Sequence, residues 1–395
     1  VWERLFQFAC IPGHPLNADR LHKYLCKLDL SDRELKWTVP LAKEDPTDQT
    51  DGSVVGPFMY WADAAAGKAS DEQVRLAAQV LLWLTSSPNR ELRDRATDVA
   101  IRVLVASQRA GAVCTHLLES FWSVNDPYVK ERLLAVMCGV LPRLNVQNAK
   151  PIAEWLLCRF WQAEEVPPHI LQREYAAFVV RHACETGLLP RDHLALLERW
   201  PQKTKPALWA EEQVDVYDKD SAYWDISSSL VPEEMGNYGD FGRYVMGSAV
   251  HHFLDAERAE PAARGMGRSG KEHDARFARR YIWQRIIELG WTPERFSEFE
   301  RGLGHSSRIS NGKRIERISK KYQWIGLHEY LGHLSDALLY REWDAAPRPL
   351  RGAWELHERD YHPELALGAG QRRDMWSESL PAWWAVDCPV PTLDS

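Results

Sequence analysis

The sequence has little that would place it in a membrane or in an oxidising compartment. No apolar run approaches the roughly 20 residues that a membrane-spanning helix needs, and the opening VWERLFQFAC shows no secretory signal. Seven cysteines are scattered along the chain without a C-x-x-C pair, which argues against a disulfide framework or a cysteine zinc site. These absences predict a cytoplasmic protein with no membrane partner.

Recognisable catalytic motifs are also missing. No G-x-S-x-G nucleophile elbow occurs. The segment GMGRSGKE at 265–272 has the G-x-x-x-x-G-K spacing of a phosphate-binding loop, but Glu272 follows Lys271 where Ser or Thr would hold magnesium. The residues before it are charged and helix-like, whereas a phosphate loop follows a buried strand. We therefore interpret the segment as a Gly-rich loop between helices and expect this chain to have no enzyme activity and no cofactor.

One further segment resembles a known metal-binding motif. HEYLGH at 328–333 resembles the zinc-protease helix, which needs histidines four residues apart so that both face the metal. His328 and His333 are five residues apart, which places them about 140° apart around a helix of 3.6 residues per turn. We therefore interpret both as structural and expect no metal site. A metal-dependent enzyme fragment that includes His328, Glu329 and His333 is kept as an alternative.

The two ends of the chain suggest a larger parent. The sequence begins on Val1 with an apolar pattern typical of a helix already under way, and PAWWAVDCPVPTLDS closes it without a capped element. We expect the chain to be a piece of a longer polypeptide.

The clearest internal organisation is a repeat marked by tryptophan. Trp83, Trp122, Trp161 and Trp200 follow one another at intervals of 39 residues, in the matching contexts AAQVLLW, HLLESFW, EWLLCRFW and LALLERW. A short polar turn and a second helix-like segment follow each of the first three. A helix–turn–helix unit of about 40 residues is typical of HEAT-type α-solenoids, in which neighbouring units share a continuous core. A non-repetitive helical bundle is the alternative.

The second helices of these units share an apolar position and a basic one. Leu92, Val129 and Ile170 occupy equivalent places, and an arginine stands three residues after each. These arginines are Arg95, Arg132 and Arg173.

The composition changes after Trp200, where turn-forming residues become frequent. We expect short strands near 213–217 and 223–230 and a return to helices from about 241. The predicted fold class is all-α, a HEAT-like α-solenoid followed by a second helical module with a short irregular, β-containing connector. The expected parts are an N-terminal helical segment at 1–56, the repeats at 57–200, the connector at 201–250, a basic helical module at 251–343 and an irregular Trp- and Pro-rich tail at 344–395.

The charge is distributed unevenly. Residues 264–321 hold 15 Lys and Arg against 7 Asp and Glu, although the whole chain has a net charge of −7. The segment GKRIERISKKYQW at 312–324 concentrates these cations on about two turns of helix beside aromatic residues. It could bind an acidic protein surface or nucleic-acid phosphates, or it could pair internally with the acidic repeats. The candidate partner or phosphate contacts are Lys313, Arg314, Arg317, Lys320, Lys321 and Trp324.

Several segments together resemble a known family. DRELKWTVPL, LTSSPNRELRDRATDVAIRVL, GNYGDFGRYVMGSAV, ARRYIWQRIIELGWTPERF, RIERISKKYQWIGLHEYLGHLSD and ERDYHPEL are similar to parts of large bacterial STAND-class NTPases, the NACHT-like and Avs-type antiphage sensors. RIERISKKYQWIGLHEYL is the most specific of them. The likeness spans nearly the whole chain and falls in the part of those proteins beyond the NTPase module.

The resemblance implies a parent with an effector, a central ATPase and a long helical-repeat arm that senses a phage protein. This chain would be a stretch of that arm, with the remainder of its own polypeptide and a protein as partners and with oligomerisation through the parent. No catalytic residue is carried over, because the family's chemistry lies in segments that this chain lacks. A solenoid offers an extended concave binding surface, which agrees with a recognition role. The alternative is a nucleic-acid-binding module that uses the basic helix at 313–321.

Overall fold

The computed structural model describes residues 2–48, 52–198, 206–237, 239–254, 275–303, 315–342, 345–350 and 361. These residues form seventeen α-helices, short 3-10 and π-helical segments and one two-stranded antiparallel sheet, so the expected all-α class is confirmed. Five features predicted from the sequence lie outside the described residues, namely the Gly-rich loop 265–272, Trp200, Lys313, Arg314 and nearly all of the tail at 344–395.

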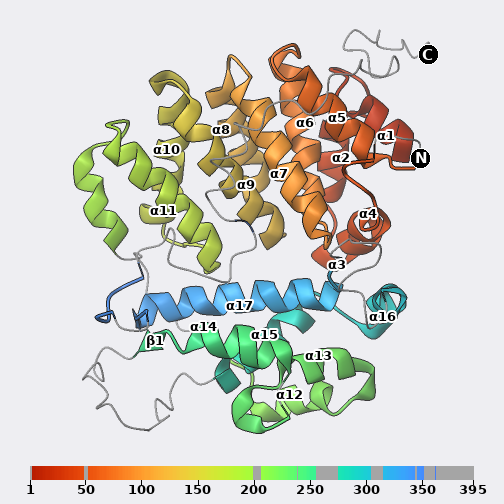
Figure 1. Cartoon of the computed structure of the whole chain (residues 1–395), viewed down its shortest axis with the longest axis vertical. Coiled ribbons are helices and arrows are strands. Elements are labelled where there is room, and N and C mark those ends of the chain that lie inside the picture. Colours follow the sequence, from red (N-terminus) through yellow and green to blue (C-terminus); the bar gives the residue numbers. More distant parts are fainter. Residues whose placement is uncertain are drawn as a thin grey trace.

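Helices up to residue 185 pack in chain order and make up the upper part of the molecule in Figure 1. The first group is α1 (Trp2–Ala9), α2 (Ala18–Leu25), α3 (Leu30–Arg33), a π-helical turn (Glu34–Thr38), α4 (Val39–Leu41) and α5 (Val55–Ala65). The second group is α6 (Asp71–Leu84), α7 (Arg90–Val105), α8 (Ala110–Trp122), α9 (Pro127–Val140), α10 (Val146–Trp161) and α11 (Ile170–Glu185). Neighbouring and alternate members of the second group pack against one another, such as α6 on α7, α8 on α10 and α9 on α11, and they enclose a shared apolar core.

Local sequence explains where these helices begin. Ser70 and Gln73 form a reciprocal capping box at the start of α6. Asn89, Asp126 and Asn145 each accept a hydrogen bond from a backbone N–H in the first turn of the helix that follows. These caps satisfy amide groups that have no partner within the helix.

The tryptophan interval corresponds to the ends of alternate helices. Trp83 is fully buried near the end of α6, and Trp161 is the last residue of α10 and is 8% exposed. Trp122 is the last residue of α8 and is only half-buried. The next unit differs, because a 3-10 helix (Arg191–Glu198) stands where a further α-helix would lie.

The equivalent apolar positions Leu92, Val129 and Ile170 are buried, as the repeat predicts. Two of the three arginines that follow them join neighbouring helices of the array: Arg95 pairs with Asp63 at 3.3 Å and Arg132 pairs with Asp94 at 2.9 Å. The third, Arg173, is paired with a residue far along the chain and is described with the site below.

The later helices form the lower part of Figure 1. They are α12 (Glu211–Asp218), α13 (Trp224–Leu230), α14 (Ser248–Val250), α15 (Ala275–Glu288), α16 (Pro293–Gly302) and α17 (Ile318–Ala337). Shorter helical segments lie at Ser221–Tyr223, Glu233–Met235 and Phe241–Gly247. Strand β1 (Phe253–Leu254) pairs with β2 (Leu339–Tyr340) and so joins the segment after α14 to the segment after α17.

The strands expected in the connector are wrong. Residues 213–217 lie within α12 and residues 223–230 lie almost entirely within α13, so the described part of the connector is helical. In α13 the buried side chains Ile226 and Leu230 are four residues apart, which is the spacing of a helix face. Aromatic and β-branched residues suggested strands, but the burial of one helical face decides the conformation.

Helix α17 lies between the two halves of the molecule. Its 20 residues extend about 30 Å, and Figure 1 shows it running past the ends of α11, α9 and α7 and along α15. Two glycines permit close approach on its two sides. A Cβ on Gly332 would lie 1.4 Å from the Pro168 carbonyl oxygen, and one on Gly326 would lie 3.1 Å from Ile282 Cα of α15. None of the helices in the described residues is both long and apolar enough to cross a bilayer.

Candidate functional site

Residues at the N-termini of three repeat helices face α17. They are the N-cap residues Asn89 of α7, Asp126 of α9 and His169 of α11. Asn89 pairs in a β-bridge with Ile315, just before α17 begins. Beside it, the buried Arg93 lies 3.6 Å from the Glu316 carboxylate. The start of α17 is thereby held against the first of the three helices.

Where α17 passes the start of α9, the two helices are joined by a fully buried cluster of charges. Lys321 Nζ lies 2.7 Å from Glu34 Oε1, 3.1 Å from Asp126 Oδ2 and 2.8 Å from the Ser86 carbonyl oxygen. None of the three charged side chains is exposed. Burial raises the pKa of Glu34, and the charge of Lys321 opposes that rise. The cluster joins the N-terminal helices, the start of α9 and α17.

Where α17 passes the start of α11, a bidentate ion pair joins the two helices. Arg173 of α11 donates to both carboxylate oxygens of Asp336, at 2.6 and 3.2 Å, and also to the Gly332 carbonyl oxygen at 3.1 Å. Both side chains are buried. Lys321 and Asp336 therefore hold α17 at two points that are 15 positions apart in the sequence, or about 22 Å along the helix.

A cleft of about 590 Å³ opens beside these crossings, where α15 and α17 approach the ends of α8, α9 and α11. It carries both apolar and charged groups. Its lining includes Trp122, Lys130, Pro167, His169, Arg285 and Glu329.

One wall of the cleft combines aromatic and cationic side chains. Lys130 Nζ lies 5.6 Å from the centre of the Trp122 ring, and Arg159 lies 5.9 Å from the same ring. Burial lowers the pKa of Lys130, while Asp126 and Glu329 act in the opposite direction. Aromatic and arginine side chains dominate binding energy at protein interfaces, so this wall has the chemistry of a contact surface.

The opposite wall contains a buried carboxylate with its own cation. Arg285 of α15 donates to Glu329 at 2.6 and 3.2 Å, and the Tyr281 hydroxyl lies 3.5 Å from the same carboxylate. Burial raises the pKa of Glu329, and Arg285 limits the rise. His333 lies on this side too, with its ring 5.6 Å from that of Tyr281.

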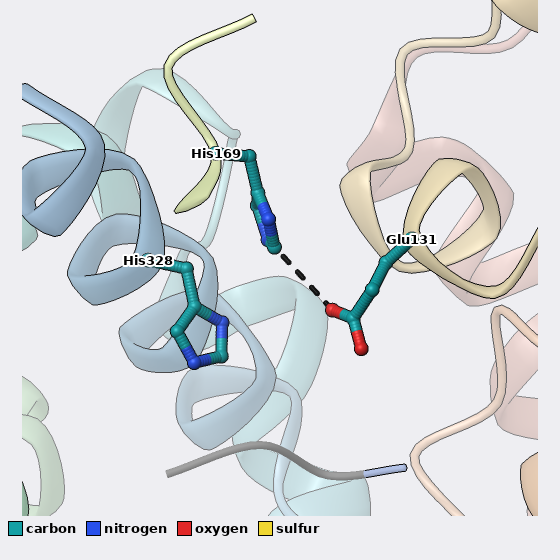
Figure 2. Close-up of side chains that lie close together, drawn as sticks. All are labelled: Glu131, His169 and His328. Carbon is teal, nitrogen blue, oxygen red and sulfur yellow. Dashed lines mark ion pairs between the residues drawn. The ribbon is translucent and has the colours of Figure 1, made fainter. Parts of the chain in front are cut away.

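A buried group of potential metal ligands lies next to the cleft. Glu131 of α9, His169 at the start of α11 and His328 of α17 each offer a ligand atom, and these atoms lie within 4.8 Å of one another. Figure 2 shows the three side chains around one small space, with His169 pointing toward Glu131 at 3.8 Å and the His328 ring beside them. Burial lowers the pKa of His169 well below its usual range, which favours the neutral, metal-binding form of the imidazole.

The predicted separation of the two histidines of HEYLGH is confirmed by their surroundings. His328 stacks on Trp324 and contacts His169, whereas His333 lies against Tyr281 of α15. The imidazole next to His328 is that of His169, at the start of α11, and not that of the second histidine of its own motif.

The described members of the basic cluster make contacts within the chain. Arg317 pairs with Asp225 at 3.1 Å, and Lys320 donates to Ser229 and lies over the Phe241 ring. Lys321 is buried and unavailable to a partner, and Trp324 packs edge-on against Phe241. Arg317, Lys320 and Lys321 pair within the chain, which is one of the readings left open by the sequence, and no part of the Lys321 side chain is exposed. Contact of the cluster with a partner stays a prediction.

Sequence reasoning missed Glu131 and His169 as site residues. The signal available was positional: Asn89, Asp126 and His169 each stand directly before the second helix of a repeat. Which residue of α17 meets each of them depends on long-range packing.

Comparison with known proteins adds no relative. No protein-family model, curated protein or solved structure matches this chain.

Proposed function

We propose that this chain is a non-catalytic helical-repeat recognition segment of a larger bacterial STAND-class defence NTPase. It binds a protein partner, such as a phage protein, and couples that binding to activation of the parent in the cytoplasm. The family part of the proposal is supported by the sequence motifs, above all RIERISKKYQWIGLHEYL. The HEAT-like character of the array is supported by the 39-residue interval and the sequential packing of α6 to α11.

The cleft is the observation that carries the recognition role. Trp122 and Lys130 line it and are partly accessible, next to helices that are held together by buried ion pairs. A partner that inserted an acidic or aromatic side chain into the cleft would meet the Trp122 ring and the Lys130 cation. The rigid surroundings would lower the entropy cost of binding.

A photo-crosslinking experiment tests this proposal. A benzophenone amino acid placed at Trp122 in the chain, expressed in phage-infected bacteria, is expected to crosslink to one phage-encoded protein. The matched control carries the same group at Val216, an exposed residue of α12. Lys130→Glu should reduce the crosslink from position 122. Equal crosslinking from both positions, or none from 122, would count against a recognition cleft.

The nucleic-acid alternative is less well supported, because Lys321 is buried and Arg317 and Lys320 are engaged within the chain. Fluorescence anisotropy with duplex DNA and single-stranded RNA separates the two functions. Binding that weakens steeply with salt and is lost on changing Lys313 and Arg314 to Glu would favour the nucleic-acid module.

A further inference from the structure

Glu131, His169 and His328 form a buried group whose potential ligand atoms lie within 4.8 Å of one another. Its members come from three helices that are far apart in sequence, and all three side chains are buried. The His169 ring is 2% exposed, and neither of its nitrogens has a hydrogen-bond partner among the described residues. A buried imidazole without such partners is costly, since each lost hydrogen bond leaves a desolvation penalty. A metal ion bound at one nitrogen would remove part of that penalty.

The chemistry of the donors favours zinc. Two imidazoles and one carboxylate form a ligand set used by zinc sites that keep an open position. Hard cations such as Mg²⁺ and Ca²⁺ prefer oxygen ligands, and this group offers oxygen from Glu131 alone. Calcium or magnesium would therefore bind poorly here.

The distances permit a metal after a small adjustment. Zinc lies about 2.0–2.2 Å from nitrogen and oxygen ligands, so tetrahedral neighbours are about 3.4 Å apart. The potential ligand atoms lie within 4.8 Å of one another, and His169 and Glu131 already approach to 3.8 Å. Binding therefore requires the ligand atoms of Glu131, His169 and His328 to approach one another by up to about 1.4 Å.

We propose that Glu131, His169 and His328 bind one Zn²⁺ ion that fastens α17 to the ends of α9 and α11. The ion occupies the part of α17 between the Lys321 cluster and the Arg173–Asp336 pair. His169 also lines the cleft, so a water molecule or a partner's side chain entering there can supply the fourth ligand. This inference is independent of the proposed recognition function.

Two cations near the site limit its affinity. The positive charges of Lys130 and Arg173 help to lower the pKa of His169, and the same charges repel a divalent cation. Arg173 is neutralised by Asp336, and Glu131 itself contributes a negative charge. These two carboxylates offset part of the repulsion between the cations and a bound Zn²⁺.

The test uses the whole chain, stripped of metal with a chelator and titrated with Co²⁺ and then Zn²⁺. We expect one Co²⁺ per chain, visible absorption bands typical of four- or five-coordinate nitrogen and oxygen ligation, and displacement by Zn²⁺. Zinc should also raise the melting temperature, because it binds only the folded state. X-ray absorption of the zinc form should show two imidazole ligands and no sulfur.

Variants then assign the ligands. His328→Gln and Glu131→Gln should each lose the Co²⁺ bands and the zinc-dependent rise in melting temperature. His333→Gln is the matched control, since it removes a histidine of the same helix that lies on the α15 side, and it should behave like the unmodified chain. If a ligand variant does not fold, the X-ray absorption of the unmodified chain still decides. Absence of stoichiometric Co²⁺ and Zn²⁺ binding by the folded chain, sulfur ligation, or equal loss in His333→Gln would overturn the proposal.

Discussion

Lys321 Nζ and Glu34 Oε1 lie 2.7 Å apart, although 287 residues separate them in the chain. The contact joins the N-terminal helices to α17, and neither side chain is exposed. A buried lysine needs compensating partners because desolvation of its charge is expensive. Glu34, Asp126 and the Ser86 carbonyl oxygen provide them.

Removal of this lysine should be strongly destabilising. Lys321→Met would leave two buried carboxylates without their cation, and breaking a buried ion pair in this way costs about 3–5 kcal/mol. The free energy of unfolding, measured by urea denaturation, should fall by that amount. Lys150→Met is the control, because Lys150 forms only an exposed pair with Glu154, and it should change the value by less than about 0.5 kcal/mol. Similar effects of the two variants would show that the Lys321 cluster is not buried as described.

Helix α17 should tolerate no side chain at Gly332. An alanine Cβ would lie 1.4 Å from the Pro168 carbonyl oxygen, so Gly332→Ala must displace α17 from the start of α11. We expect a loss of about 2–4 kcal/mol in unfolding free energy. At Gly302 a Cβ would meet nothing within 4 Å, and Gly302→Ala should leave stability unchanged or raise it by up to about 1 kcal/mol. Circular dichroism melts of both variants check this, and equal melting temperatures would contradict it.

The two tryptophans Trp83 and Trp122 should differ in their effect on stability. Trp83 is fully buried and donates a hydrogen bond to His22, so Trp83→Ala should cost about 3–5 kcal/mol. Trp122 is half-buried and faces the cleft, and Trp122→Ala should cost less than half as much. Denaturant unfolding of the two variants distinguishes the cases. A larger loss for Trp122 would mean that its ring belongs to the core.

Stability should fall in mild acid because of His22. Burial lowers the pKa of His22 to about 4, from 6.5 in an unfolded chain, and its Nδ1 accepts a hydrogen bond from Trp83. Between these two values the unfolded state binds the additional proton, so the stabilisation is present above pH 6.5 and is lost as the pH falls toward 4.

The expected loss from this residue is about 2–3 kcal/mol. His22→Gln does not titrate, so its unfolding free energy, followed in urea from pH 7 down to about pH 4.5, should decline less than that of the unmodified chain. Parallel pH profiles would exclude His22 as the source of the acid sensitivity.

The sequence of α17 is apolar on all sides of the helix. Buried residues occur all around this helix, including Tyr322, Ile325, Leu327 and Leu331. A helix that is apolar on every side is buried between layers and is not a surface helix. The charged residues at its start predict partner binding, because a buried lysine and a solvated lysine are identical in sequence.

Local features of this protein follow from short stretches of its sequence. The spacing of tryptophans and apolar residues specified helices α6 to α11, and Ser, Asn and Asp residues specified where α6, α7, α9 and α10 begin, because capping and helical periodicity depend on residues within one or two turns. Only the tertiary structure decided that α17 crosses the ends of α7, α9 and α11. That arrangement brings together Lys321 with Glu34 and His328 with His169, and it depends on the packing of surfaces hundreds of residues apart, which no local pattern encodes.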